Sequence, residues 1–120
     1  MIRYINCYRK APDLSAEDFR GYWRGAEFDE LIQKIARLTG AVRHNKSLTL
    51  QVGMGEDLVS DRGLAQPYDG IVEYYWENAR HLPEVYATEE ARSLIEQMAR
   101  YQGQFIDLAN STAFFTELQD

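Results

Sequence analysis

The amino-acid sequence predicts an α+β fold in which a four-stranded antiparallel sheet carries helices on one face. Three observations support this prediction. Strand-like and helix-like segments follow one another in the order βαββαβ. Right-handed crossovers in that order place both helices on the same face of the sheet and leave the other face bare. Polar and aromatic residues gather on one side of the expected strands, which suits a pocket better than an apolar core.

The expected elements form two halves, each consisting of a strand, a helical segment and a second strand. In order, they are a strand Ile2–Arg9, a helix from Ser15 to about Leu38, a strand near Val42–Val52, a strand Ile71–Trp76, a helical stretch Asn78–Ile106 and a strand Thr112–Leu118.

The first helix has a clear beginning and an expected break. Ser15 can cap the helix, and Asp18 follows three residues later in a pattern like a capping box. The apolar stripe of its first two turns does not continue into the later apolar residues of the segment. We therefore expect a kink or break near Gly25, because glycine is about 1 kcal/mol less favourable than alanine inside a helix.

The second helical stretch is expected to contain an ordinary core helix that begins after Thr88, an N-cap residue followed by Glu89 and Glu90 in the first turn. Before it, a shorter helical turn from Asn78 to Tyr86 is expected to be interrupted by Pro83.

Between the two halves, residues 53–67 hold three glycines, several acids and no periodicity. A loop of this length in a small domain indicates a lid, an arm that contacts a partner, or a disordered flap. We expect it to be more mobile than the sheet and to border the pocket mouth or a partner subunit.

Length and charge limit the classes of function. The 120 residues suit a single domain, 1–120, that is large enough to form a core. A net charge of −6 without a basic cluster makes nucleic acid a poor partner, and no apolar run approaches the roughly 18 residues that span a membrane. The single cysteine, Cys7, and the absence of a charged-then-apolar leader indicate a cytoplasmic protein.

The order and spacing of several short segments resemble the EthD-like family of dimeric α/β barrels over nearly the whole chain. These segments are residues 9–15, 18–20 and 22–24 in the first half, and residues 67–73, 105–107 and 114–117 in the second. The resemblance implies a ferredoxin-like protomer whose sheet packs against the sheet of a second copy, so that a barrel closes with a small-molecule pocket in each protomer.

The resemblance also implies a range of activities. Such families include cofactor-free enzymes that cyclise, decarboxylate or isomerise polyketide-like or aromatic acids, and many members without a known activity. Four residues after Trp23 the family commonly has histidine, whereas this chain has Glu27. A histidine-based mechanism therefore does not transfer directly.

Three residues are candidates for acid/base catalysis, each with a structural alternative. Glu27 begins an apolar row, so desolvation could raise its pKa and suit it to proton transfer; otherwise it is a solvated or ion-paired residue at the kink. Glu73 lies in the middle of a strand, where acids are rare, and is either catalytic, or exposed at an edge or paired in a salt bridge. His44 on the second strand could transfer protons near neutral pH or simply face solvent.

The candidates for substrate binding are mainly strand residues. Those expected on the bare face of the sheet, with Glu73, are Tyr4, Asn6, Tyr8 and Tyr75. Their phenols and amide could orient a carbonyl or phenol, or the tyrosines could fill a dimer core. Ile5 and Cys7 alternate with them and are expected to pack against the helices.

Tyr22 and Trp23 are expected in the wall of the pocket or core. His44 and His81 are far apart in sequence, without a second ligand at helical spacing, so no metal site is expected.

Three functions remain open at this point. The first is an enzyme without a cofactor that acts by acid/base chemistry on an aromatic or polyketide-like carboxylic acid. The second is a binding or accessory protein for a hydrophobic metabolite. The third and weakest is a cofactor-free or haem-degrading monooxygenase of the related barrel type, for which Asn6, Trp76 and His81 are the candidate residues.

Overall fold

The computed structural model describes residues 1–119. Its elements, in chain order, are β1 (Ile2–Tyr8), α1 (Ala16–Trp23), α2 (Ala26–Thr39), β2 (Arg43–Leu48), α3 (Gly53–Asp61), β3 (Gly70–Trp76), α4 (Leu82–Tyr86), α5 (Glu89–Gln102), a 3₁₀ turn η1 (Leu108–Asn110) and β4 (Thr112–Glu117).

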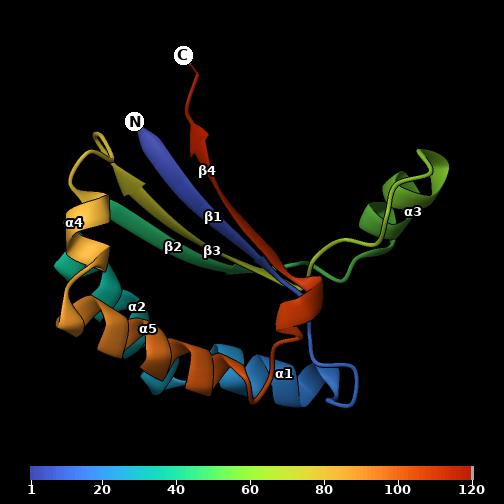
Figure 1. Ribbon diagram of the computed structural model, residues 1–120. Helices are drawn as coiled ribbons and strands as arrows, with labels where there is room; N and C mark the ends of the chain where they lie inside the picture. Colours follow the sequence, from blue (N-terminus) through green and yellow to red (C-terminus); the bar gives the residue numbers. More distant parts are fainter. Residues whose placement is uncertain (120) are drawn as a thin grey trace.

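The four strands form one sheet in the order β2-β3-β1-β4, and all neighbouring strands are antiparallel. Helices α1, α2 and α5 lie together on one side of this sheet (Figure 1). The predicted α+β architecture, with helices on one face of a four-stranded antiparallel sheet, is confirmed.

The first helical segment begins and breaks where the sequence indicated. The Ser15 hydroxyl accepts a hydrogen bond of 3.0 Å from the Asp18 amide, and α1 ends at Trp23. Gly25 is the N-cap of α2. A Cβ atom at Gly25 would lie 2.6 Å from the Tyr101 hydroxyl, so glycine also permits the close approach of α5.

The second helical stretch divides into α4 and α5. The Thr88 hydroxyl caps α5 by accepting from the Ala91 amide at 3.2 Å, as predicted. Pro83 does not interrupt the shorter helix, and the prediction that it would is wrong. It lies in the first turn of α4, where a helix requires no amide hydrogen.

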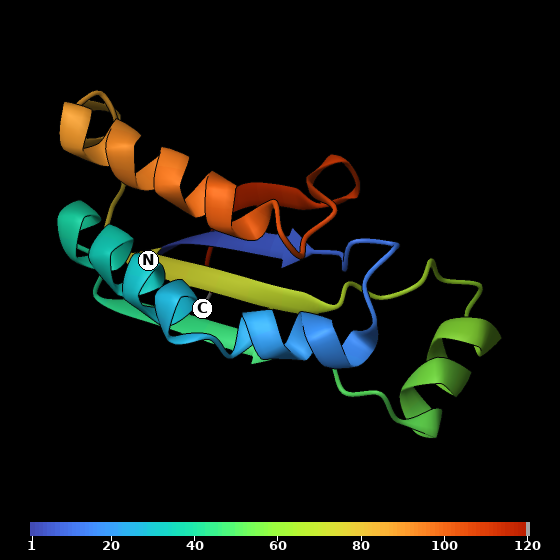
Figure 2. The ribbon, with the colours of Figure 1, turned by 90° about the horizontal axis from the view of Figure 1, so that it is seen from below.

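Residues 53–61 form helix α3, which corrects the prediction of an irregular loop from 53 to 67. Met54, Glu56 and Leu58 are strong helix formers and outweigh the two glycines of this segment. None of the α3 residues is buried, and both ribbon views show the helix projecting beyond the end of the sheet (Figures 1 and 2).

The apolar core lies between the sheet and the helices. Its largest fully buried side chains include Trp23, Phe28, Trp76 and Phe105. A Cβ atom at Gly70 would lie 2.4 Å from the Trp23 ring, so the first residue of β3 must be small for the indole to pack there. None of the helices within residues 1–119 has the length and apolarity that a membrane crossing requires.

The strand register separates the residues that were expected to share the bare face. Tyr4 pairs with Tyr74 and Phe115, whereas Ile5 pairs with Glu73 and Phe114. Directly paired residues point to the same side of an antiparallel sheet.

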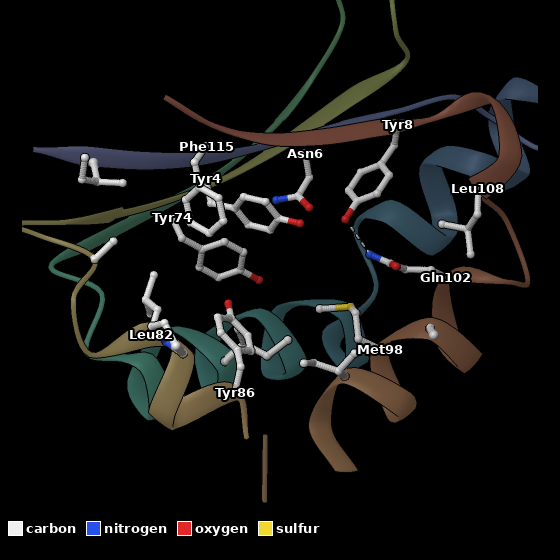
Figure 3. Close-up of a pocket in the computed structure, with 16 residues that line it drawn as sticks. Tyr4, Asn6, Tyr8, Tyr74, Leu82, Tyr86, Met98, Gln102, Leu108 and Phe115 are labelled. Carbon is white, nitrogen blue, oxygen red and sulfur yellow. Dashed lines mark hydrogen bonds between the residues drawn. The ribbon is translucent and has the colours of Figure 1, made fainter. Parts of the chain in front are cut away.

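Tyr4, Asn6 and Tyr8 therefore face the helices, and Figure 3 shows them above α2 and α5. Glu73 and Tyr75 lie on the opposite, bare face together with Ile5 and Cys7. The prediction for Glu73 and Tyr75 therefore holds. The prediction that Tyr4, Asn6 and Tyr8 share the bare face, and that Ile5 and Cys7 pack against the helices, is wrong. The period of two fixes the alternation within each strand, but it does not determine which set meets the helices.

Candidate functional site

A cavity of about 850 Å³ lies between the helix-facing side of the sheet and helices α2, α4 and α5 (Figure 3). Its walls are mostly apolar, and its volume is within the range of sites that enclose small organic molecules. The lining residues are Ile2, Tyr4, Asn6, Tyr8, Ile35, Tyr74, Ala79, Leu82, Pro83, Tyr86, Ile95, Met98, Ala99, Gln102, Leu108 and Phe115.

Six of these side chains bring polar groups into the cavity. The alternation of β1 presents three of them to the helices, β3 supplies one, the last residue of α4 supplies another, and the last residue of α5 supplies the sixth. They are Tyr4, Asn6, Tyr8, Tyr74, Tyr86 and Gln102.

Three of the six are held in place by hydrogen bonds within the protein. The Gln102 side-chain amide donates to the Tyr8 hydroxyl at 3.0 Å, which ties α5 to β1. The Asn6 amide nitrogen donates to the Val72 carbonyl at 3.1 Å. This bond orients the Asn6 side chain so that its amide oxygen, an acceptor, faces the cavity (Figure 3).

The hydroxyls of Tyr4, Tyr74 and Tyr86 come from three different elements, β1, β3 and α4. None of them has a hydrogen-bond partner within residues 1–119. Figure 3 shows the Tyr74 and Tyr86 hydroxyls pointing toward one another, with the Tyr4 hydroxyl beside them. Burial raises the pKa of all three phenols, and at Tyr74 the neighbouring phenols of Tyr8, Tyr86 and Tyr4 raise it further. These hydroxyls are therefore neutral hydrogen-bond donors throughout the physiological pH range.

Within the described part of the chain, the cavity wall contains no Asp, Glu, Lys, Arg or His side chain. The remaining ionisable groups are the four phenols, and burial raises the pKa of Tyr8 to about 12. The wall can therefore donate hydrogen bonds and stack against rings, but it offers neither a counter-charge nor a base that titrates near neutral pH.

The cavity reaches the surface between α5, the turn η1 and β4. Three of its lining residues there, Ile95, Leu108 and Phe115, are between 44% and 52% exposed. The Phe115 ring stacks on Tyr4 with ring centres 4.5 Å apart, so the phenol cluster and the rim share an aromatic wall.

Glu27 is not part of this cavity, and the prediction that it lines the principal cavity is wrong. Its side chain is exposed beside a separate polar depression that includes Arg100 and Tyr101. Ile35 on the same helix does line the cavity, but eight residues of helix separate the two positions by about 12 Å along the axis. The part of α2 that lines the cavity is therefore near Ile35, about two turns after Glu27.

His44 and Glu73 also lie outside the cavity, so the three acid/base candidates do not converge. His44 is exposed on the edge strand β2. Glu73 lies on the bare face, where its carboxylate accepts hydrogen bonds from Arg3 and from the Tyr75 hydroxyl, each at 3.0 Å. This is the salt-bridged alternative that the sequence left open for Glu73, and it places Tyr75 outside the cavity as well.

The other expected pocket residues belong to the core. Trp23 is 1% exposed, and the Tyr22 ring stacks on Phe105. Trp76 and His81 both contact the Thr39 carbonyl, which ends α2, at 3.0 and 2.6 Å. Neither of these two lines the cavity, so only Asn6 of the three residues considered for a monooxygenase does so.

Sequence reasoning found Tyr4, Asn6 and Tyr8 but missed Tyr74, Tyr86 and Gln102. A signal existed for Gln102, because it follows Met98 by four residues and interrupts the apolar row of α5 with an amide. Tyr86 had no such signal, since its position depends on how α4 packs. Within residues 1–119, no group of three or more His, Cys, Asp or Glu residues is arranged to hold a metal ion.

Comparison with known proteins shows the same fold in several solved structures. An EthD family protein from Bacillus halodurans has a TM-score of 0.61 at 13% identity, and the match covers 99% of this chain and 100% of that one. A dimeric protein of ferredoxin-like fold from Bacteroides fragilis has a TM-score of 0.61 at 9% identity, covering 98% and 95%. SnoaB, a cofactor-independent oxygenase from Streptomyces nogalater, has a TM-score of 0.59 at 10% identity, covering 99% and 93%.

These similarities confirm a ferredoxin-like fold of the kind found in an EthD family protein, which is the fold that the sequence resemblance implied. No protein-family model and no curated protein sequence matches the chain.

Proposed function

We propose that this chain is an enzyme that acts on a small aromatic or polyketide-like molecule held in the cavity between the sheet and the helices. The observation that carries the proposal is the cavity itself, an apolar space of about 850 Å³ into which four phenols and two amides project. A large apolar pocket with a few convergent polar groups is the usual form of a small-molecule site. The fold shared with a cofactor-independent oxygenase supports the same proposal and the expectation of chemistry without a cofactor.

The chemistry we propose depends on hydrogen-bond donors rather than on carboxylates. Neutral phenols directed at a substrate carbonyl or phenol oxygen stabilise the negative charge that develops there when an adjacent C–H bond breaks and its proton passes to water at the open side of the cavity. Asn6 adds an oriented acceptor, its amide oxygen, at the same wall. Cyclisation, isomerisation and oxygenation by molecular oxygen of an enolisable substrate all develop such charge. Glu27, His44 and Glu73 have no part in this proposal because they lie outside the cavity.

The first experiment tests occupancy of the cavity with the neutral fluorophore N-phenyl-1-naphthylamine. We expect saturable binding to the whole chain and at least tenfold weaker binding to Ala99→Trp, because the indole would fill space beside Met98. Ala16→Trp is the matched control, since Ala16 is exposed on α1 away from the cavity. Absence of saturable binding, or equal binding to both variants, would contradict the proposal.

A second candidate function is a binding protein that holds a hydrophobic metabolite without turnover. It is favoured by one observation, namely that no group in the cavity wall of the described chain titrates near neutral pH. Native mass spectrometry of the purified protein would identify a retained ligand by its mass. Incubating that ligand with fresh protein separates the two functions, because an enzyme changes its mass or retention time and a binding protein returns it unaltered.

We further propose that the chain forms a homodimer, and a dimeric α/β barrel, through the bare face of the sheet. That face carries the 47% exposed Phe114 and the partly buried pair of Arg3 and Glu73, and no helix covers it (Figure 1). A structure with the same fold is described as dimeric. Light scattering after size exclusion should give twice the chain mass for the wild type and a monomer for Phe114→Glu, with Arg92→Glu on exposed α5 as the control. A monomeric wild type at micromolar concentration would contradict the proposal.

The projecting helix α3 fits the same assembly. Met54 and Leu58 are 72% and 53% exposed, and no residue from 53 to 67 lines the main cavity. The expectation that this segment borders the pocket mouth of its own chain is therefore wrong. Its contact with a partner subunit stays a prediction.

A further inference from the structure

We infer that the hydroxyls of Tyr4, Tyr74 and Tyr86 together form the binding site for a single oxygen atom of an uncharged aromatic ketone or phenol, and that the cavity rejects aromatic carboxylates. This inference deepens the proposed function and rests on it, because it names the class of molecule that the cavity takes. It also narrows the substrate expected from the sequence, which was an aromatic or polyketide-like carboxylic acid.

The first support is the convergence of three donors that have nothing else to bind. The hydroxyls come from β1, β3 and α4, and none has a hydrogen-bond partner within residues 1–119. Figure 3 shows them meeting in the part of the cavity nearest α4. Tyr74 is only 5% exposed, and its hydroxyl opens onto the cavity space rather than being sealed in the core, so a ligand in the cavity can reach it. An oxygen with two lone pairs placed among them would satisfy two of the three donors at once.

The second support is that the neighbouring polar groups are tied to the protein. The Tyr8 hydroxyl accepts from Gln102 and keeps its own hydrogen free, and the Asn6 amide nitrogen donates to Val72. Three of the four phenol donors of the wall are therefore gathered at one position, and the Tyr8 hydroxyl lies apart from them beside Gln102 (Figure 3). A ligand with one strong acceptor and an otherwise apolar body matches this distribution.

The third support is the absence of a counter-charge. No Lys, Arg or His side chain of residues 1–119 lines the cavity, so a bound carboxylate would lose its water without gaining an ion pair. The same desolvation that raises the pKa of the phenols would raise the pKa of a bound carboxylic acid. An acid would then bind in its protonated form. Its apparent affinity at neutral pH would be low, because only a small fraction of the free acid is protonated there.

The fourth support is the shape of the apolar wall around the cluster. Phe115 stacks on Tyr4, and Ile35, Leu82 and Met98 complete the surroundings with aliphatic groups. Aromatic rings prefer such offset stacking, so a flat ring system attached to the oxygen would lie against the Phe115 side of the cavity.

The test uses two ligands of nearly the same shape that differ in charge, 2-acetylnaphthalene and 2-naphthoate, with naphthalene as the reference without an oxygen. Each competes with N-phenyl-1-naphthylamine for the wild-type chain at pH 7. We expect 2-acetylnaphthalene to bind at least tenfold more tightly than 2-naphthoate, and 2-naphthoate to gain affinity as the pH is lowered.

The variants Tyr74→Phe and Tyr86→Phe test the phenol cluster directly. Each is expected to lower the affinity for 2-acetylnaphthalene by about three- to tenfold and to leave the affinity for naphthalene unchanged, because only the ketone oxygen loses a donor. Tyr75→Phe is the matched control, since its hydroxyl binds Glu73 on the opposite face of the sheet. Circular dichroism of each variant, and its retained affinity for naphthalene, verifies that it folds.

The outcomes separate this inference from the proposed function. If naphthalene and the fluorophore bind but 2-naphthoate binds as tightly as 2-acetylnaphthalene at pH 7, the inference is overturned while the cavity remains a small-molecule site. If Tyr74→Phe and Tyr86→Phe both keep the full preference for the ketone over naphthalene, the phenol cluster is overturned as the oxygen site. If none of the probes binds, the proposed function itself fails.

Discussion

The side-chain amide of Gln102 donates a hydrogen bond of 3.0 Å to the hydroxyl of Tyr8 and so joins the last residue of α5 to the last residue of β1. Both groups line the cavity; Gln102 is 6% exposed and Tyr8 is partly buried. Beyond them, the chain continues into the packed core around Phe105. The bond therefore ties the end of α5 to the end of β1 across the cavity.

Replacing Gln102 by leucine should lower the free energy of unfolding by about 1–3 kcal/mol. The reason is that the partly buried Tyr8 hydroxyl would lose the partner that ties it to α5. Urea denaturation followed by circular dichroism measures the change. Glu96→Ala on the exposed side of α5 is the control and should change stability by less than about 0.5 kcal/mol.

The double variant Tyr8→Phe with Gln102→Leu tests the cause of that loss. Removing both partners leaves no unsatisfied group, so its destabilisation should be smaller than the sum of the two single variants. Additive effects would show that the hydrogen bond is not the source.

The buried phenols should make the fold sensitive to alkaline pH. Burial raises the pKa of Tyr8 to about 12 and also raises that of Tyr74, relative to 10.0 in an unfolded chain. Their contribution to stability is fully present below pH 10 and is lost as the pH rises toward 12, because the unfolded chain releases these protons first. For Tyr8 alone, two pKa units correspond to about 2–3 kcal/mol.

Two measurements test this expectation. In a pH titration, tyrosinate absorbance should rise near pH 10 in urea, whereas in the native protein part of the rise should come at higher pH. Tyr74→Phe should lose less stability above pH 10 than the wild type. Native titration of all the tyrosines near pH 10 would contradict the burial of these hydroxyls.

Gly70→Ala should destabilise the fold by about 1–3 kcal/mol. A Cβ atom there would lie 2.4 Å from the Trp23 ring, and that indole is 1% exposed and has no room to retreat. Gly53→Ala is the matched control, because nothing lies within 4 Å of its Cβ position at the start of α3. Thermal unfolding should show a lower midpoint for Gly70→Ala and an unchanged or slightly higher one for Gly53→Ala.

Glu27→Gln should leave ligand binding and any turnover unchanged. The sequence predicted the opposite, but the structure places this carboxylate at the surface, outside the main cavity. Fluorophore affinity and activity toward an identified substrate are the measurements, with Tyr74→Phe as the comparison that should respond. A large loss in Glu27→Gln would restore the acid/base hypothesis for this residue.

Local chemistry made much of the fold predictable from the sequence. The serine and threonine caps, the glycine at the break between α1 and α2 and the alternation of polar residues in β1 each depend on a few neighbouring residues. The same alternation identified Tyr4, Asn6 and Tyr8 as one set, and this set does line the cavity.

The tertiary structure alone decided which face each set occupies and which residues meet. Alternation within β1 and within β3 is equally compatible with either face, and only the register of the sheet places Tyr4 beside Tyr74 and removes Glu73 to the other side. Tyr86 joins them because α4 packs over the sheet, and Glu27 is excluded because its helix reaches the cavity two turns later. Contacts between residues distant in sequence depend on how rigid elements are positioned against one another, and a local pattern does not contain that information.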